Sequence, residues 1–201
     1  MITVKIDERV VKIPTGWREV TYRVYCKLAT KGHDLIGSLA VLTGIDDATW
    51  RTANFTQGVD HIFQATMFLN NVPRPFRNPT RCGPYILGPN IETMAQLNAI
   101  TEQCQISGNS KDMAVQLQCL ANIAAIYCQG IGETFDKEKA LYVGQTIQDL
   151  PCEEVLGTGN YYMTKALSIV SKRPQDDFRG QALYADSKQP FFKRLWRSLS
   201  H

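Results

Sequence analysis

The segment Met113–Cys128 constrains the fold more than any other part of this sequence. It is long and strongly apolar, and its apolar side chains are Val115, Leu117, Leu120, Ile123, Ala124, Ile126 and Tyr127. A helix of this kind cannot present a wide face to water and has to be covered by other elements. The segment therefore predicts a central core helix. Gly130 and Gly132 follow it and predict the end of that helix.

Cap and turn residues divide most of the remaining chain into further helices. Thr21, Asp34 and Asp136 are suitable N-caps, because their side chains can accept hydrogen bonds from backbone amides of a first turn. The expected helices cover 22–30, 35–42, a short segment that carries Trp50, a segment that starts at Thr56 or Gln57, 91–105, 137–149, and 151–172 with a break near Gly157-Thr158-Gly159.

The N-terminus has a different periodicity. Apolar and polar residues alternate over 2–6 and again over 9–13, and Pro14 ends the second run. This pattern predicts a short β-hairpin at residues 2–13. Because two strands alone are marginally stable in water, the hairpin needs to lie on helices or to pair with another chain. The expected fold class is therefore mainly α with a small N-terminal β-hairpin, a helical bundle of the α+β type.

Residues 70–90 hold five of the nine prolines, and no acidic residue. Proline disfavours helices and central strands, so we expect an extended arm here, with a short strand at 85–87 that could join the hairpin. The arm is either an ordinary solvated connection or a segment that docks on a partner. In the second case, the contact residues would be Arg74, Phe76, Arg77 and Arg81.

The C-terminal residues 173–201 form a tail in the expected organisation, after a single mostly helical domain at 1–172. Four basic residues and no acidic residue follow Asp186, so the net charge of +3 is concentrated in this tail. Residues 191–199 predict an amphipathic helix that either closes on the core or docks in a partner's groove. Its expected contact residues are Phe191, Phe192, Arg194, Trp196 and Arg197.

Motifs for catalysis, cofactor binding and metal binding are absent from the sequence. It contains no P-loop, no complete dinucleotide-binding glycine motif, no nucleophile elbow and no HExxH motif. The three histidines are scattered, and the acidic pairs at 46–47 and 153–154 lie at expected helix starts, where they favour the helix dipole. The six cysteines form no CxxC pair and are expected to be buried thiols. We expect no catalytic, cofactor-binding or metal-binding residues, and no enzyme.

Several motifs resemble those of one group of phage proteins. The first is the stretch Val11-Lys12-Ile13-Pro14-Thr15-Gly16-Trp17-Arg18-Glu19-Val20-Thr21, followed by Tyr25 and Leu28. The others are Ala124-Ala125-Ile126-Tyr127, Phe135-Asp136-Lys137-Glu138, Leu150-Pro151, and Leu156-Gly157 with Asn160-Tyr161-Tyr162. Over about residues 10–170 the chain resembles phage tail assembly chaperones and virion morphogenesis proteins, including those of crAss-like and related gut phages. The resemblance implies a non-enzymatic protein and carries no site residues.

The sequence therefore predicts a bacteriophage structural or morphogenesis protein, a ring or connector component of the head–tail or tail region. A tail assembly chaperone is the alternative. A nucleic-acid-binding accessory protein that uses the arginines of the arm and the tail is a further alternative, and an enzyme with an unrecognised site is the least favoured. The expected partners are other phage structural proteins and copies of the same chain in a homo-oligomeric ring, with no membrane. We expect synthesis in the host cytoplasm, without a secretory signal, and a place in the virion.

Overall fold

The computed structural model describes residues 1–6, 9–30, 34–53, 59–74, 79–88, 90–128 and 134–171. Its strands are β1 (Ile2–Ile6), β2 (Arg9–Ile13), β3 (Arg81–Cys82) and β4 (Tyr85–Ile86). Its helices are α1 (Tyr22–Thr30), α2 (Leu35–Thr43), α3 (Asp47–Thr52), α4 (Val59–Thr66), α5 (Met94–Asn109), α6 (Met113–Tyr127), α7 (Lys137–Thr146) and α8 (Cys152–Ser171), with short 3-10 helices η1 (Trp17–Glu19), η2 (Met67–Asn70) and η3 (Ile147–Asp149). The predicted fold class, mainly helical with an N-terminal hairpin, is confirmed.

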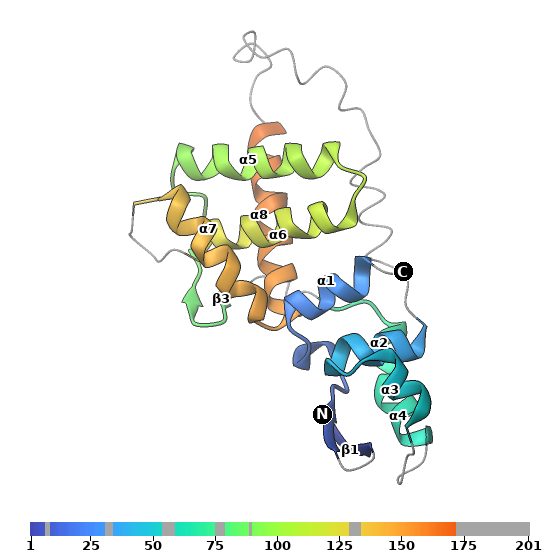
Figure 1. Ribbon diagram of the computed structural model, residues 1–201. Helices are drawn as coiled ribbons and strands as arrows, with labels where there is room; N and C mark the ends of the chain where they lie inside the picture. The colour runs from blue at the N-terminus through green and yellow to red at the C-terminus, as the bar shows by residue number, and fades with distance from the viewer. Residues whose placement is uncertain are drawn as a thin grey trace.

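Helix α6 is the centre of the larger of two hydrophobic clusters. Figure 1 shows it beside α5, α7 and α8, and all but a few of its side chains are buried. The close packing of α6 on α8 includes the parallel stack of Tyr127 on Tyr162, whose ring centroids are 3.3 Å apart. The prediction that Met113–Cys128 forms the core helix is therefore confirmed.

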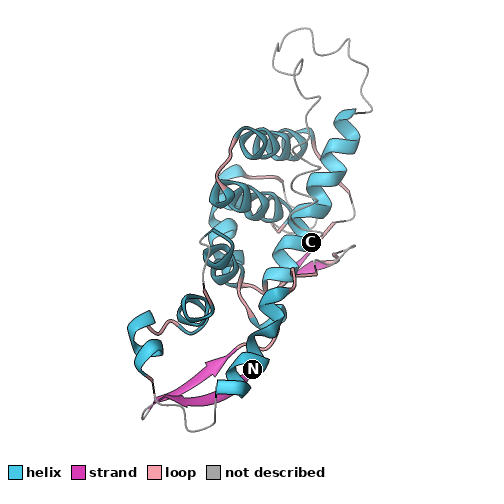
Figure 2. Ribbon diagram, turned by 90° about the vertical axis from the view of Figure 1, so that its right-hand side faces the viewer, coloured by secondary structure: helices cyan, strands magenta, loops and turns pink. Residues whose placement is uncertain are grey.

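The smaller cluster joins the hairpin to α2, α3 and α4. Strand β1 pairs antiparallel with β2, with Val4 opposite Val11, and the inward side chains Val4, Ile6, Val11 and Ile13 are all buried. Helix α2 belongs to both clusters, because Leu39 is buried in the smaller one whereas Leu42 packs against the larger one. Figure 2 shows the hairpin at the end of the molecule opposite to the last turn of α8.

The start of α1 is fixed directly to the start of α8. The backbone amide of Tyr22 donates to the carbonyl of Leu150 at 2.8 Å, and that of Cys152 donates to the carbonyl of Val20 at 2.9 Å. The Tyr22 hydroxyl, which is buried, donates to the carbonyl of Leu117 in α6 at 2.6 Å. These hydrogen bonds fix the start of α1 against the helical bundle.

Helix α8 differs from its prediction, because it continues through Gly157-Thr158-Gly159 without a break. The glycine allows the close approach of α6: a Cβ atom at position 159 would lie 2.6 Å from the carbonyl oxygen of Leu120. Gly159 therefore permits a close contact between two helices and does not mark a turn.

The segment 79–88 also differs from the expected arm. Strands β3 and β4 pair only with each other and do not join the N-terminal hairpin. Cys82 is fully buried, and Gly83 has a φ of +56°, which glycine tolerates. The backbone amide of Gly83 donates to Glu154 Oε2 at 2.7 Å. This part of the proline-rich stretch is therefore packed on the first turn of α8 and does not extend away from the core.

We expect Gly159→Ala to lower the free energy of unfolding by about 1–3 kcal/mol, because the added methyl group meets backbone and not a movable side chain. Gly108→Ala is the matched control. Gly108 lies in helix α5 with open space around it, and alanine there should raise the free energy of unfolding by up to about 1 kcal/mol. Urea unfolding of both variants measures the difference, and equal stabilities would contradict the close contact.

Candidate functional site

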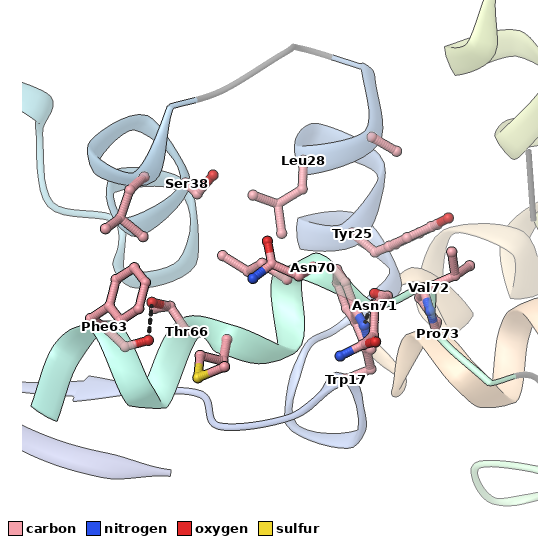
Figure 3. Close-up of a pocket in the computed structure, with 14 residues that line it drawn as sticks. Trp17, Tyr25, Leu28, Ser38, Phe63, Thr66, Asn70, Asn71, Val72 and Pro73 are labelled. Carbon is pink, nitrogen blue, oxygen red and sulfur yellow. Dashed lines mark hydrogen bonds between the residues drawn. The ribbon is translucent and has the colours of Figure 1, made fainter. Parts of the chain in front are cut away.

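A cleft of about 520 Å³ lies where α1, α2 and the α4–η2 segment meet. Its lining residues are Trp17, Tyr25, Leu28, Ala29, Leu35, Ser38, Phe63, Thr66, Met67, Leu69, Asn70, Asn71, Val72 and Pro73. Figure 3 shows Phe63 and Ser38 at one end, Leu28 over the middle, and Trp17 with Asn71, Val72 and Pro73 at the other end. Since α1 packs on the bundle and α4 packs on the hairpin, the cleft lies between the two hydrophobic clusters.

Trp17 forms a fixed aromatic wall at one end. Its ring makes edge-to-face contacts with Tyr25 and Phe68, with centroids 5.6 Å and 5.0 Å apart, and its indole N–H donates to the carbonyl of Asn71 at 2.7 Å. The ring is half-buried and not fully enclosed. An indole that is held on three sides and exposed on the fourth presents a rigid surface to whatever enters the cleft.

The end of the cleft at residues 72–74 is held by Glu153, a buried residue in the first turn of α8. Its Oε1 accepts from the backbone amide of Arg74, and its Oε2 accepts from Arg18 Nε, both at 3.3 Å. The pair Glu153-Glu154 was predicted to serve the helix start, and it does lie in the first turn. Its observed hydrogen bonds, however, are made to Arg18, Arg74 and Gly83, far away in sequence. The two carboxylates therefore attach the proline-rich segment to α8.

The opposite end of the cleft is apolar and open to solvent. Phe63 is 55% exposed, Met67 is 53% exposed and Leu35 is 39% exposed. Val59, Phe63 and Met67 are four residues apart along α4 and η2, so they form one stripe, whereas Ile62 is buried in the hairpin cluster. Large apolar side chains that gather beside a cleft are typical of a binding surface.

The chemistry of the lining suits binding. Besides apolar side chains, the lining offers the hydroxyls of Ser38 and Thr66 and the amides of Asn70 and Asn71. The Thr66 hydroxyl already donates to the carbonyl of Ile62 at 2.9 Å. Burial raises the pKa of Tyr25 to about 12, so this phenol stays neutral near pH 7. The cleft can thus hold apolar side chains of a partner and satisfy a few of the partner's backbone groups.

Two of the predicted contact residues lie in the described part of the chain. Arg74 is exposed and directly follows the lining residue Pro73, whereas Arg81 is exposed on β3 and is not part of the lining. The other predicted contact residues, Phe76, Arg77, Phe191, Phe192, Arg194, Trp196 and Arg197, lie outside the described residues. The expected tail helix and the middle of the expected arm lie outside them as well.

The cleft was not predicted from the sequence, in which the region of α4 was expected only as a helix that starts at Thr56 or Gln57. The segment 59–69 has more apolar residues than one buried helix face can accommodate, and Phe63 and Met67 are the surplus. This excess of apolar residues could have indicated an exposed apolar surface. Which of them remain exposed depends on how α4 packs against the hairpin, and the periodicity of α4 does not specify that packing.

The acidic pair at 46–47 behaves as predicted. Asp46 is the N-cap of α3, with its side chain accepting from the amide of Thr49 at 2.8 Å, and Asp47 forms an ion pair with Arg51 one turn later. Of the other candidates considered for catalysis, His61 is exposed on α4 and His33 lies outside the described residues. Within the described ranges, no group of three His, Cys, Asp or Glu side chains is arranged to hold a metal ion.

Comparison with known proteins gives no match: no protein-family model, no curated protein and no solved structure matches the chain. The resemblance to phage tail assembly and morphogenesis proteins therefore stays a prediction. None of the helices in the described part of the chain is both long and apolar enough to cross a membrane.

The cysteines are free thiols, as predicted; five of them are buried and Cys26 is half-buried. Burial raises the pKa of Cys26 to about 11 and those of Cys104 and Cys152 to about 12. A thiol with a raised pKa has little of the reactive thiolate at neutral pH. The Cys152 thiol is also engaged, because it donates to the carbonyl of Trp17 at 3.3 Å.

We expect the native protein to react slowly with a disulfide reagent such as DTNB at pH 8, and to show six reactive thiols per chain after denaturation.

The same burial predicts a loss of stability at high pH. Because folding raises these pKa values, the stabilisation is complete below the ordinary thiol pKa of about 9 and decreases as the pH rises through 11–12. Thiol titration and unfolding curves between pH 7 and 11 measure both effects. A rapid reaction of several thiols in the native state would contradict the burial.

Proposed function

We propose that this protein is a non-enzymatic bacteriophage structural protein, a ring or connector component of the virion that acts through contacts between subunits. The observation that carries the proposal is the cleft between the two clusters, with the apolar side chains Phe63, Met67 and Leu35 exposed at its open end. The assignment to a phage draws its support from the sequence motifs between residues 10 and 170.

Burial in one cleft stabilises a complex too little to hold an isolated pair of molecules together, so an assembly with several contacts for each subunit is favoured. Full burial of a Phe, Met or Leu side chain is worth roughly 1.5–3 kcal/mol. Since Phe63 and Met67 are already about half-buried and Leu35 more so, their completed burial adds only about 3 kcal/mol in all. Association costs at least about 4 kcal/mol in lost translational and rotational freedom.

A single occupied cleft therefore gives a weak complex. In a closed ring every subunit makes two contacts with its neighbours. Further contacts outside the cleft add to the free energy of association. Arg74 and Arg81 are exposed and suited to this role, because arginine offers planar donors to carboxylates and to backbone carbonyls. Phe76 and Arg77 of the arm, and the aromatic and basic residues of the tail, complete the proposed set of contacts.

The direct experiment is to measure whether the protein is present in purified particles, and at what copy number. We expect a small fixed number of copies per virion. A protein that is absent from particles but bound to a tail protein in infected cells would instead be the tail assembly chaperone. A strict monomer that is found in neither setting would contradict both.

A matched pair of variants tests the cleft itself. Phe63→Asp should abolish incorporation into particles, because a carboxylate at the open end opposes burial against a partner. Leu141→Asp on α7 is the control, since Leu141 is 56% exposed and Phe63 is 55% exposed, so both replacements cost little stability. Competition of each variant with the wild-type chain during particle assembly gives the measurement. Equal incorporation of the two variants would contradict a role of the cleft.

A further inference from the structure

We propose that Cys82 and Cys128 form a redox-sensitive pair of thiols, which a peroxide converts to a disulfide that fixes β3 to the end of α6. The inference goes beyond the proposed function and does not depend on it. Three features support it: the contact between the two sulfur atoms, the buried hydroxyl group beside them, and the thin cover that the β3–β4 hairpin gives to the site.

The two thiols come from distant parts of the sequence and meet on one face of α8. Cys82 lies in β3, Cys128 is the C-cap of α6, and both side chains are fully buried in the larger cluster. Cys82 lies beside Thr158 of α8. One turn later on α8, Tyr162 stacks on Tyr127, the residue before Cys128. This packing brings the two sulfur atoms into hydrogen-bond contact with each other.

The other four cysteines provide a comparison. Burial is the main cause that raises the pKa of Cys104 and of Cys152 to about 12, and the nearby thiols of Cys119 and Cys26 add a smaller effect through charge. In the proposed pair, by contrast, the largest influence on the pKa of each thiol is the hydrogen bond with the other one. The pair is therefore in closer contact than the remaining thiols are.

The hydrogen bond gives the two thiols different roles. Donation from the Cys128 thiol lowers the pKa of Cys82 because it stabilises the thiolate, and the same bond raises the pKa of Cys128, together with burial. The buried Thr158 hydroxyl has no oxygen or nitrogen partner in the described part of the chain, and it also lowers the pKa of Cys82, against the effects of burial and of Glu154. Cys82 is therefore the thiol that ionises first and attacks an oxidant.

The cover over Cys82 is thin. Arg81, Pro84 and Ile86 are exposed around it, and Figures 1 and 2 both show the hairpin at the edge of the molecule. Strands β3 and β4 pair over two residues each, and in the described part of the chain neither pairs with another strand. Because so short an element opens locally without global unfolding, a small oxidant such as hydrogen peroxide can reach Cys82 while the bundle stays folded.

The oxidation proceeds in two steps. The Cys82 thiolate attacks one oxygen of hydrogen peroxide, so that an S–O bond forms, the O–O bond breaks, and the leaving hydroxide takes up the proton lost by Cys82 and departs as water. The Cys128 sulfur then attacks the sulfur of the sulfenic acid. The S–S bond forms, the S–O bond breaks, and the second hydroxide leaves as water with the proton of Cys128. The two sulfur atoms lose two electrons in total, and the peroxide accepts them.

The disulfide joins the proline-rich stretch covalently to the core helix. The sulfur atoms move from hydrogen-bond contact to a bond of about 2 Å, and the small β3–β4 hairpin is the element free to make this adjustment. Because the bond closes a long loop of the unfolded chain, it stabilises the folded state. The oxidised protein should therefore unfold at a higher temperature than the reduced protein.

Peroxide treatment of the reduced full chain under native conditions tests the proposal. After denaturation, we expect DTNB to detect four thiols instead of six, and dithiothreitol to restore all six. The melting temperature of the oxidised chain should be higher by roughly 5–15 °C. Chymotryptic peptide mapping should find Cys82 joined to Cys128. Trypsin is unsuitable, because its peptides keep Cys82 with Cys104 and Cys119 with Cys128.

A disulfide that involves another cysteine or joins two copies would overturn the proposal. Six remaining thiols, or a loss of thiols that dithiothreitol does not reverse, would overturn it as well. None of these outcomes bears on the presence of the protein in particles, so the proposed function is tested separately.

Three variants test the assigned roles. Cys128→Ala should accumulate a sulfenic acid at Cys82, which the reagent dimedone traps, whereas Cys82→Ala should leave Cys128 unlabelled. Cys104→Ala is the control, because Cys104 is also buried but lies outside the pair, and this variant should form the disulfide as the wild-type chain does. Dimedone labelling of Cys128 in place of Cys82, or loss of the disulfide in Cys104→Ala, would contradict the assignment.

Discussion

The burial of α6 on nearly every side is the constraint on which the remaining structure depends. Its small residues Ala121, Ala124 and Ala125 are fully buried, and they allow neighbouring helices to approach closely. The contact with α8 is tight enough that position 159 has no room for a methyl group beside the carbonyl of Leu120. Once α5, α7 and α8 have covered α6, the start of α8 has a defined place, and the hydrogen bonds around Thr21 and Pro151 attach α1 to it.

The cleft follows from that attachment. Trp17 and Tyr25 belong to the part of the chain that the bundle holds, whereas Phe63 belongs to the part that packs on the hairpin. Glu153 connects the two regions by holding Arg18 on one side and the backbone of Arg74 on the other. A binding surface at the boundary of two clusters is common, because side chains at such a boundary are only partly covered by either core.

The sequence predicted most of the helices and the hairpin, because these depend on local patterns. Thr21 marks the start of α1, Asp34 and Asp46 cap α2 and α3, and the alternation over 2–13 specifies the hairpin. The start of α5 was predicted three residues too early, because Thr93 and Gln96 form a reciprocal cap that places Met94 first. The continuity of α8, the β3–β4 pairing and the cleft could not be predicted, since each depends on which distant segment packs nearby: Leu120 on Gly159, Glu154 on Gly83, and the hairpin on α4.

The bonds between the start of α1 and the start of α8 have a consequence for synthesis on the ribosome. Tyr22 finds its partners only when Leu117 and Leu150 have been made, about 95 and 128 residues later. At about 5–20 residues per second, the aromatic residues near position 20 wait on the order of 10 seconds for their packing partners. During that interval the nascent chain exposes the surface that later forms the wall of the cleft, so this wall is fixed in place only after Leu150 has been made.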